Sequence, residues 1–283
     1  MLAHGPGILT EARAEGRAVP AFTTYTLEST RAVCEAAART GLPVILSAGS
    51  SSFRGSSRAM LAAAAIAAAR EAEVPVGVHL DHSTDLTEIR ACLGLGYTSV
   101  MVDGSPLSFE ENIALTRTVV AEAHSVGVWV EAELGAVAGD EDSSTGAEAG
   151  RLTDPQQAAE FVEQTGVDAL AAAIGTVHGF TAAPVHVDLD RLRQICTLTD
   201  VPFVLHGASG LSDGELAAAV AAGVAKVNIN AELRRAYHDA LAAGTGNGSD
   251  DITRLQNELV AAMAEVAEQK LILLSGPNTT KEH

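Results

Sequence analysis

The stretch VGVHLDHSTDLTEIRACLGLGYTSVMVDGS, from Val76 to Ser105, contains two short apolar runs separated by a stretch with helical periodicity. The first run, Val76–Leu80, leads into Asp-His, and the second, Ser99–Val102, leads into Asp-Gly. Two apolar strands joined through a helix are typical of a βαβ unit, in which the strands are parallel and polar residues follow their carboxyl ends.

The same alternation recurs along the whole chain. It predicts eight strands, at Val19–Phe22, Pro43–Ser47, Val76–Leu80, Ser99–Val102, Val128–Glu133, Ala169–Ile174, Pro202–Leu205 and Ala225–Ile229. Eight such units favour an α/β fold of the closed (β/α)8 type, a TIM barrel, over an open doubly wound sheet. A connector over Ala242–Asp251 and an extra C-terminal helix over Ile252–Gln269 complete the prediction. Since no Pro- or Gly-rich linker divides the chain in the middle, residues 1–283 are expected to form a single domain.

Composition excludes several classes of function. The chain has 47% apolar residues, enough for a large core, and a net charge of −18, which opposes nonspecific binding to nucleic acid or to an anionic membrane. The purest apolar run, Met60–Ala69, is too short to span a bilayer, and Met1–Gly16 lacks the pattern of a signal peptide. Three distant cysteines without CxxC spacing indicate a reduced compartment. A cytoplasmic protein without nucleic-acid or membrane partners is expected.

Polar residues cluster where the predicted strands end, and they belong to six different strands. They are His79, Asp81, His82, Asp103, Glu131, Glu133, His178, His206 and Asn228. A lone histidine in such a place is usually structural, but histidines that end three separate strands of a barrel converge on one mouth. Three neutral imidazoles with an open coordination position are typical of a catalytic site for zinc or a similar metal.

Six segments, in order along nearly the whole chain, resemble the class II, metal-dependent fructose-bisphosphate and tagatose-bisphosphate aldolases. These segments are Val76–Asp85 (VGVHLDHSTD), Ser99–Ser105 (SVMVDGS), Val130–Asp142 (VEAELGAVAGDED), Ala173–Gly179 (AIGTVHG), Val204–Gly210 (VLHGASG) and Gly223–Leu233 (GVAKVNINAEL). The resemblance implies a reversible aldol cleavage or condensation of a ketose or ketose phosphate, with an enediolate like that of dihydroxyacetone phosphate on Zn²⁺ or another divalent metal.

By this resemblance, His82, His178 and His206 match the metal ligands, Asp81 matches the acid/base beside the first ligand, and Glu141 matches the mobile-loop glutamate that handles the carbon-bound proton. The chemistry explains these residue types. A divalent metal acts as a Lewis acid that neutralises the enediolate, while one carboxyl group moves the hydroxyl proton and another the carbon proton. The acidic, Gly-rich segment 136–150, which contains Glu141, is expected to overhang the mouth as a lid.

Four further residues carry open alternatives. Asp103 and Glu133 match positions that hold the ligands in place or bind a second, monovalent cation, or they orient a loop. His79 is expected in an interior barrel layer or directly behind the metal ligands. Lys226 could act as the Schiff-base lysine of a metal-free aldolase, although the three histidines argue against this, or lie at the bottom or the outer wall of the barrel.

The resemblance also implies a phosphate pocket built from backbone N–H groups and a serine hydroxyl. Its matching residues are Gly179, Gly207, Ser209 and Asn228. The sequence departs from the family around it, with Thr23 in place of Asn, Thr181-Ala182 in place of Tyr-Lys, and Ala231 in place of Thr. Losing a hydrogen bond to a charged phosphate costs about 1.5 to 3 kcal/mol, so an altered substrate preference is expected.

Two other classes of function stay open at this stage. A metal-dependent hydrolase or epimerase could use the same three histidines to activate water, and a non-catalytic protein could keep the pocket only to bind a sugar phosphate. For the aldolase, the partners are a small ketose or ketose phosphate and an aldehyde, and the resemblance implies a homodimer or a homotetramer.

Overall fold

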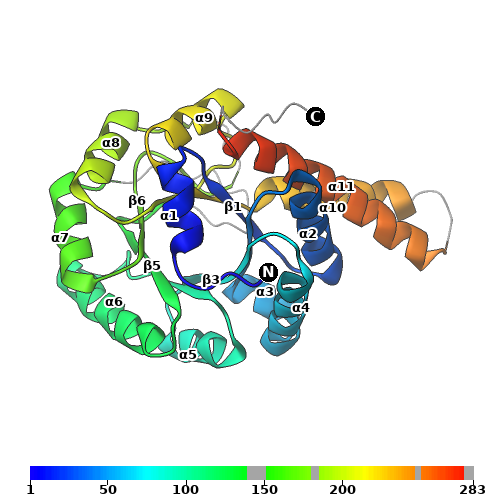
Figure 1. Ribbon diagram of the computed structural model, residues 1–283, viewed down its shortest axis with the longest axis horizontal. Helices are drawn as coiled ribbons and strands as arrows, with labels where there is room; N and C mark the ends of the chain where they lie inside the picture. Colours follow the sequence, from blue (N-terminus) through cyan, green and yellow to red (C-terminus); the bar gives the residue numbers. More distant parts are fainter. Residues whose placement is uncertain (139–150, 180–184, 246–249, 277–283) are drawn as a thin grey trace.

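The eight predicted strands form a closed, parallel barrel in chain order (Figure 1). The structure is a computed structural model that describes residues 1–138, 151–179, 185–245 and 250–276. Its strands are β1 (Val19–Thr23), β2 (Val44–Gly49), β3 (Val76–Ser83), β4 (Ser99–Val102), β5 (Trp129–Leu134), β6 (Ala169–Ala172), β7 (Phe203–Leu205) and β8 (Val224–Ile229). β8 pairs with β1, which closes the ring. The predicted TIM-barrel class is confirmed.

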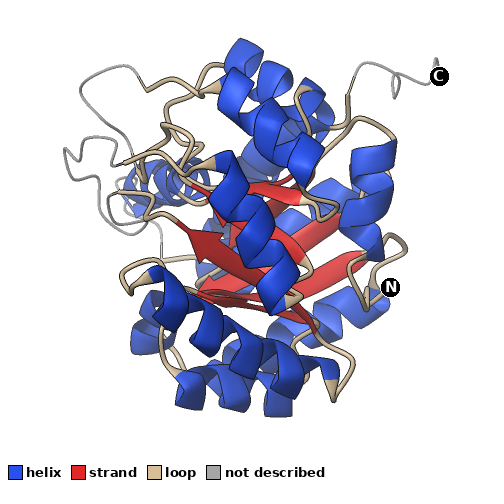
Figure 2. Ribbon diagram, turned by 90° about the vertical axis from the view of Figure 1, so that its left-hand side faces the viewer, coloured by secondary structure: helices blue, strands red, loops and turns tan. Residues whose placement is uncertain are grey.

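Helices form a layer around the strands, as Figure 2 shows in blue around red. They are α1 (Gly7–Ala14), α2 (Leu27–Thr40), α3 (Ser50–Gly55), α4 (Arg58–Glu71), α5 (Leu86–Leu95), α6 (Phe109–His124), α7 (Pro155–Thr165), α8 (Leu189–Leu198), α9 (Asp213–Ala221), α10 (Ala231–Thr245) and α11 (Ile252–Leu274). Capping residues explain several of the starts. Ser108 and Ser212, for example, accept hydrogen bonds from the N–H groups of Glu111 and Glu215, which return the contact in capping boxes.

The chain beyond β8 differs from the sequence prediction. α10 continues to Thr245 and thus occupies the first part of the predicted connector, and α11 ends at Leu274 and not at Gln269. The two helices pack against each other closely: a Cβ on Gly244 would lie 2.4 Å from Leu255 Cδ1. The glycine that indicated a connector therefore permits a tight helix–helix contact, and the pair forms an arm at the side of the barrel (Figure 1).

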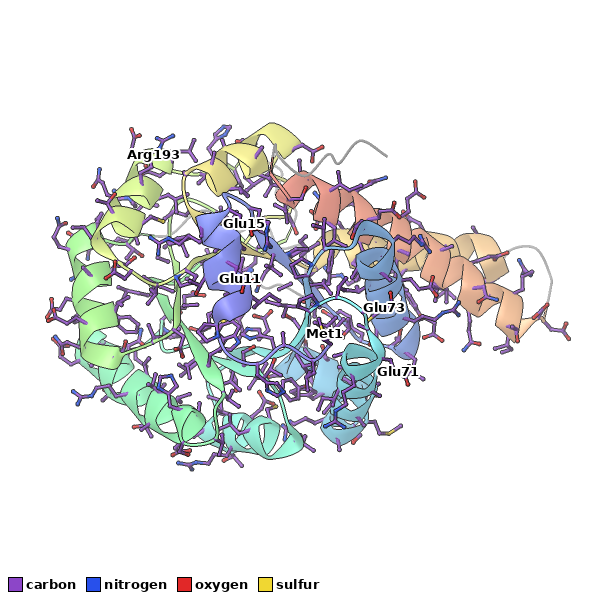
Figure 3. The ribbon with its side chains drawn as sticks, viewed as in Figure 1. Met1, Glu11, Glu15, Glu71, Glu73 and Arg193 are labelled. Carbon is purple, nitrogen blue, oxygen red and sulfur yellow. The ribbon has the colours of Figure 1, made fainter. Side chains whose placement is uncertain are left out.

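The amino-terminal end of the barrel is covered by α1, which lies across it in Figure 1. Ile8 and Leu9 of α1 pack on apolar side chains inside the barrel, whose cluster includes Trp129 of β5. Figure 3 shows Glu11 and Glu15 on this helix, at the end of the molecule opposite the carboxyl ends of the strands. With one end covered, the carboxyl-terminal mouth is where a ligand can approach the interior.

Candidate active site

The three predicted metal ligands converge at the carboxyl-terminal mouth. His82 is on β3, His178 lies in the loop that follows β6, and His206 directly follows β7. His82 has a φ of 43°, the one positive φ of a non-glycine residue in the described part of the chain, and the pairing of β3 with β4 changes register between Leu80 and Ser83. A backbone irregularity of this kind costs energy and redirects a side chain, so it is common at functional sites.

One ring nitrogen from each of the three imidazoles lies within 4.8 Å of the other two. His206 Nδ1 is 2.7 Å from His82 Nε2, and the ring centroids of the three pairs are 4.5 to 5.8 Å apart at nearly perpendicular planes. The two close nitrogens are at hydrogen-bond distance, and a cation bound by both of them would replace this contact.

The outer nitrogens of two of these rings contact carboxylates. His82 Nδ1 lies 3.2 Å from Asp103 Oδ2, and His206 Nε2 lies 2.8 Å from Glu131 Oε1. Such contacts fix the tautomer and the orientation of a ligating histidine and raise its basicity. Glu131 was noticed in the sequence only as a polar strand residue, and its contact with a candidate ligand was missed.

Asp103 and Glu133 form a second candidate group with His82. Glu133 Oε2 is buried and has no hydrogen bond from the described residues; it lies 3.9 Å from His82 Nδ1, while Oε1 accepts one from Val137 N. Burial raises the pKa of Glu133 to about 7, an effect that His82 opposes and Asp103 reinforces. Burial acts on Asp103 in the same direction, but hydrogen bonds from His82 and Ser105 outweigh it and hold the pKa of Asp103 below its ordinary value.

This donor set fits a divalent cation. Three imidazole nitrogens match the ligands of catalytic zinc sites, and the orphaned oxygen of Glu133 is a buried acceptor that a cation would satisfy. The residues that would hold the metal are His82, His178 and His206, with Glu133 as the adjacent carboxylate.

Asp81 lies beside these histidines and is 3% exposed. Asn228 Nδ2 donates to both of its carboxylate oxygens, at 3.0 and 3.3 Å. The backbone of β2 approaches from the other side, since a Cβ on Gly49 would be 3.0 Å from Asp81 O. Asp81 is thus held in a fixed orientation at the mouth.

A cavity of about 400 Å³ opens above this group. It is lined by Asp81, His82, Asp103, Glu133 and His178, together with residues that the sequence analysis did not single out: Gly49, Ser50, Ser51, Arg54, Ser105, Pro106, Ala136, Val137 and Asn230. Thr23, the first departure from the family pattern, also lines it. The run SSSFRG of α3 directly follows β2, and a polar run after a barrel strand was a signal that could have indicated this side of the cavity.

The four residues of the expected phosphate pocket come together next to this cavity. Gly179, Gly207, Ser209 and Asn228 line one small hollow with His178, Ala208 and Asn230. Ser209 Oγ donates to Glu232 Oε2 at 3.1 Å, a contact that an anion would have to replace. Ala231 is buried at the start of α10 and lines neither cavity. Glu141 and Thr181-Ala182 lie outside the described residues, as does most of the predicted lid.

Gly207 allows two loops of this pocket to approach each other. It has a φ of 64°, and a Cβ there would lie 2.7 Å from the backbone C and O of Val177. We expect Gly207→Ala to lower the free energy of unfolding, measured with urea, and to raise the KM for a phosphorylated substrate. Gly210→Ala is the matched control, since Gly210 has a φ of 91° and no described atom within 4 Å of an added Cβ. That variant should lose only the about 1 to 3 kcal/mol of backbone strain that a side chain causes at a positive φ. Equal losses in the two variants would contradict the importance of the contact.

Lys226 lies inside the barrel, and neither at its bottom nor on its outer wall. It is fully buried, and Nζ donates to Glu131 Oε2 at 2.8 Å and to Asn228 Oδ1 at 2.7 Å. With its Nζ engaged by a carboxylate and an amide oxygen, Lys226 is poorly placed to act as a nucleophile that forms a Schiff base. His79 is also in the interior, as predicted, stacked on Trp129 with Nδ1 2.8 Å from Ser99 Oγ.

The barrel and its mouth define a class of protein: a barrel enzyme with a candidate three-histidine metal centre. The sequence profile of a family described as fructose-bisphosphate aldolase class-II matches residues 5–279. The solved YdjI aldolase from Escherichia coli K12 is 34% identical, with a TM-score of 0.89 and coverage of 99% of this chain and 100% of that one. A putative fructose-1,6-bisphosphate aldolase from Coccidioides immitis is also 34% identical, with a TM-score of 0.90 and 98% of each chain covered.

A third structure, the fructose-bisphosphate aldolase of Campylobacter jejuni, supports the fold, with 23% identity, a TM-score of 0.82 and coverage of 99% of this chain and 97% of that one. The chain belongs to the class II fructose-bisphosphate aldolase family. It is therefore an aldehyde-lyase of a metal-dependent family that acts on sugar phosphates, in agreement with the resemblance seen in the sequence. Among the described residues, no helix has the length and apolar character required to cross a membrane.

Proposed function

We propose that this protein is a zinc-dependent aldolase that cleaves or forms the carbon–carbon bond of a ketose phosphate. The observation that carries the proposal is the convergence of His82, His178 and His206 beside Asp81, at the open mouth of a barrel that belongs to this family. A divalent ion held by these histidines would supply a Lewis acid for the ketone carbonyl and the negative charge that develops next to it.

The side chains of the chain itself divide the proton transfers. Asp81 would take the hydroxyl proton of the ketose during cleavage and return it during condensation, and Asn228 keeps both its oxygens in place by hydrogen bonds. Glu141 would remove or return the proton on the carbon, a role that rests on the family resemblance. His82 and His206 are oriented by Asp103 and Glu131, so that the candidate ligating nitrogens, His82 Nε2 and His206 Nδ1, face each other at 2.7 Å.

The substrate would be bound by backbone and side-chain donors at one end and by the larger cavity at the other. Gly207 and Ser209 line the small hollow, which suits the phosphate of a dihydroxyacetone-phosphate-like ketone. The larger cavity, with Arg54 in its lining, would take the aldehyde part. Thr23, which lines the larger cavity, favours a ketose other than fructose 1,6-bisphosphate, or one with fewer phosphates. Ala231 favours the same on the family resemblance, which expects a hydroxyl there.

A screen of purified, zinc-loaded protein tests this proposal. Phosphorylated and unphosphorylated ketoses are supplied one at a time, and the aldehyde products are identified by mass spectrometry. Release of an aldehyde that stops when the metal is chelated and returns with Zn²⁺ is the expected result. Hydrolysis of a chromogenic ester without any retro-aldol product would overturn it. We also propose a homodimer or homotetramer, to be measured by light scattering in solution.

Restoring a hydroxyl at residue 231 is expected to improve the use of fructose 1,6-bisphosphate. Ala231→Thr should lower its KM, by up to roughly tenfold if one hydrogen bond to a charged group is regained. Ala231→Val is the matched control, because valine has the shape of threonine without its hydroxyl. If the unmodified protein already uses the bisphosphate with a high kcat/KM and Ala231→Thr changes nothing, the substitution at this position does not set the substrate preference.

A further inference from the structure

Lys226 links two parts of the candidate site that lie on different strands. Its ammonium group donates to Glu131 on β5 and to Asn228 on its own strand, β8. Glu131 uses its other oxygen on His206 Nε2, and Asn228 uses its amide N–H on Asp81. Lys226 is therefore connected through Glu131 to His206, a candidate metal ligand. Through Asn228 it is connected to Asp81, the candidate acid/base.

Lys226 and Glu131 form a buried ion pair. Lys226 and Glu131 are both fully buried, and Lys226 is the one lysine or arginine in contact with Glu131 in the described part of the chain. The nearest other base is His79, whose Nε2 is 3.6 Å from Glu131 Oε2. Burial and the neighbouring Lys226 lower the pKa of His79, so it is neutral and does not replace the lysine as counter-ion.

Stability alone does not account for this arrangement. The interior of a TIM barrel is commonly filled by branched apolar side chains, and the layer toward the amino-terminal end is apolar here too, with Val19, Ala21 and Ile45. A buried ion pair contributes little net stability compared with apolar side chains of the same volume. The position of the pair directly beneath His206 and Asp81 indicates a role in the site.

We propose that Lys226 is a positioning residue that orients His206 through Glu131 and Asp81 through Asn228. Its ammonium group holds one oxygen of Glu131, so that the other oxygen lies against His206 Nε2 and His206 Nδ1 is directed toward His82. Its hydrogen bond to Asn228 Oδ1 fixes the orientation of that side-chain amide. The amide nitrogen Nδ2, and not the oxygen, therefore faces Asp81. This inference rests on the proposed aldolase function and assigns both effects to one side chain.

Four variants of the full-length protein separate the two branches. Lys226→Met removes the charge and both donors, Glu131→Gln keeps the shape of the carboxylate without its charge, and the double variant removes both charges together. The double variant also guards against misfolding, since it leaves no uncompensated buried charge. Val227→Ala, a buried neighbour on β8 that packs toward the helices, is the control for a general weakening of the strand.

The first readout is the Kd for Zn²⁺, measured by competition with a chelator and without substrate. Lys226→Met and Glu131→Gln are both expected to weaken binding by about 10- to 100-fold, as is typical when the partner of a ligating histidine is lost. The d–d spectrum of the Co²⁺-loaded protein should change in the same variants. Val227→Ala should leave both unchanged, and an equal loss in that variant would overturn the role of Lys226.

The second readout is taken at saturating metal and compares cleavage of fructose 1,6-bisphosphate with exchange of the α-proton of dihydroxyacetone phosphate. Because the Asn228 branch serves Asp81, Lys226→Met and the double variant should lose about tenfold more cleavage than exchange, whereas Glu131→Gln should keep the ratio. An unchanged ratio together with an unchanged Kd in Lys226→Met overturns the inference. If the unmodified protein binds Zn²⁺ but catalyses neither reaction, the proposed function fails, and the Kd alone decides on Lys226.

Discussion

Replacement of any one of His82, His178 and His206 by alanine is expected to abolish stoichiometric metal binding and to lower aldol turnover by more than about a thousandfold. The loss is large because the three nitrogens form one cluster within 4.8 Å, and a tetrahedral site with two protein ligands holds zinc weakly. Without the cation, several kcal/mol of charge stabilisation in the transition state are absent. Elemental analysis and a retro-aldol assay on each variant measure the two effects.

His124 provides the matched control for these variants. It lies at the end of α6, where Nε2 is 2.7 Å from Asp168 Oδ2, away from the mouth of the barrel. His124→Ala should keep both metal and turnover. Full zinc occupancy in all three ligand variants would show that the cluster is not the metal site.

The barrel was predictable because each strand–helix unit is indicated by a local pattern of apolar and polar residues. The apolar run Val76–Leu80 indicates a strand and the residues after it indicate a helix. The same pattern recurs along the chain, and the eight strands close into a barrel. Element ends were less accurate. β3 continues to Ser83, since the polar Asp81 still pairs with β2 and Ser83 with β4 at the mouth, although such side chains are typical of a loop.

The position of the candidate site was also predictable, because the carboxyl ends of parallel strands meet wherever the helices lie. The sequence places His82, His178 and His206 at the ends of three strands, and their ring nitrogens meet at that mouth. The four residues of the expected phosphate pocket likewise line one hollow.

The contacts behind these residues could not be predicted. Lys226 and Glu131 are 95 positions apart in the chain, and their pairing depends on which side chains of β5 and β8 face inward at the same height in the barrel. Local patterns carry no such information, so Lys226 was open to several interpretations. The place of Arg54 in the lining of the cavity could not be predicted for a related reason. It depends on how the short helix α3, which carries Arg54, is oriented after β2.

The two candidate acid/base carboxyl groups are expected to have separable effects on proton transfer. Asp81→Ala should lower the rate of carbon–carbon cleavage by about 10²- to 10⁴-fold, as is typical when a general acid/base is lost. Exchange of the α-proton of dihydroxyacetone phosphate with solvent should continue. Exchange survives because it needs the metal and the group that acts on carbon, and neither is removed. Asp85→Ala is the control, since Asp85 only caps α5 through Thr87 N. Deuterium incorporation followed by NMR, beside an aldehyde-release assay, gives both rates.

Glu141→Ala should have the opposite signature. If Glu141 removes the proton from carbon, its loss suppresses deuterium incorporation into dihydroxyacetone phosphate and the condensation that depends on it, while Kd for Zn²⁺ stays unchanged because Glu141 is not among the proposed ligands. Asp142→Ala, next to it in the same acidic segment, is the matched control for the charge of that segment. Equal exchange rates in Glu141→Ala and in the unmodified protein would assign the carbon acid/base to another residue. Glu133, whose buried Oε2 lies beside His82 and has no hydrogen bond within the described part of the chain, would be the next to test.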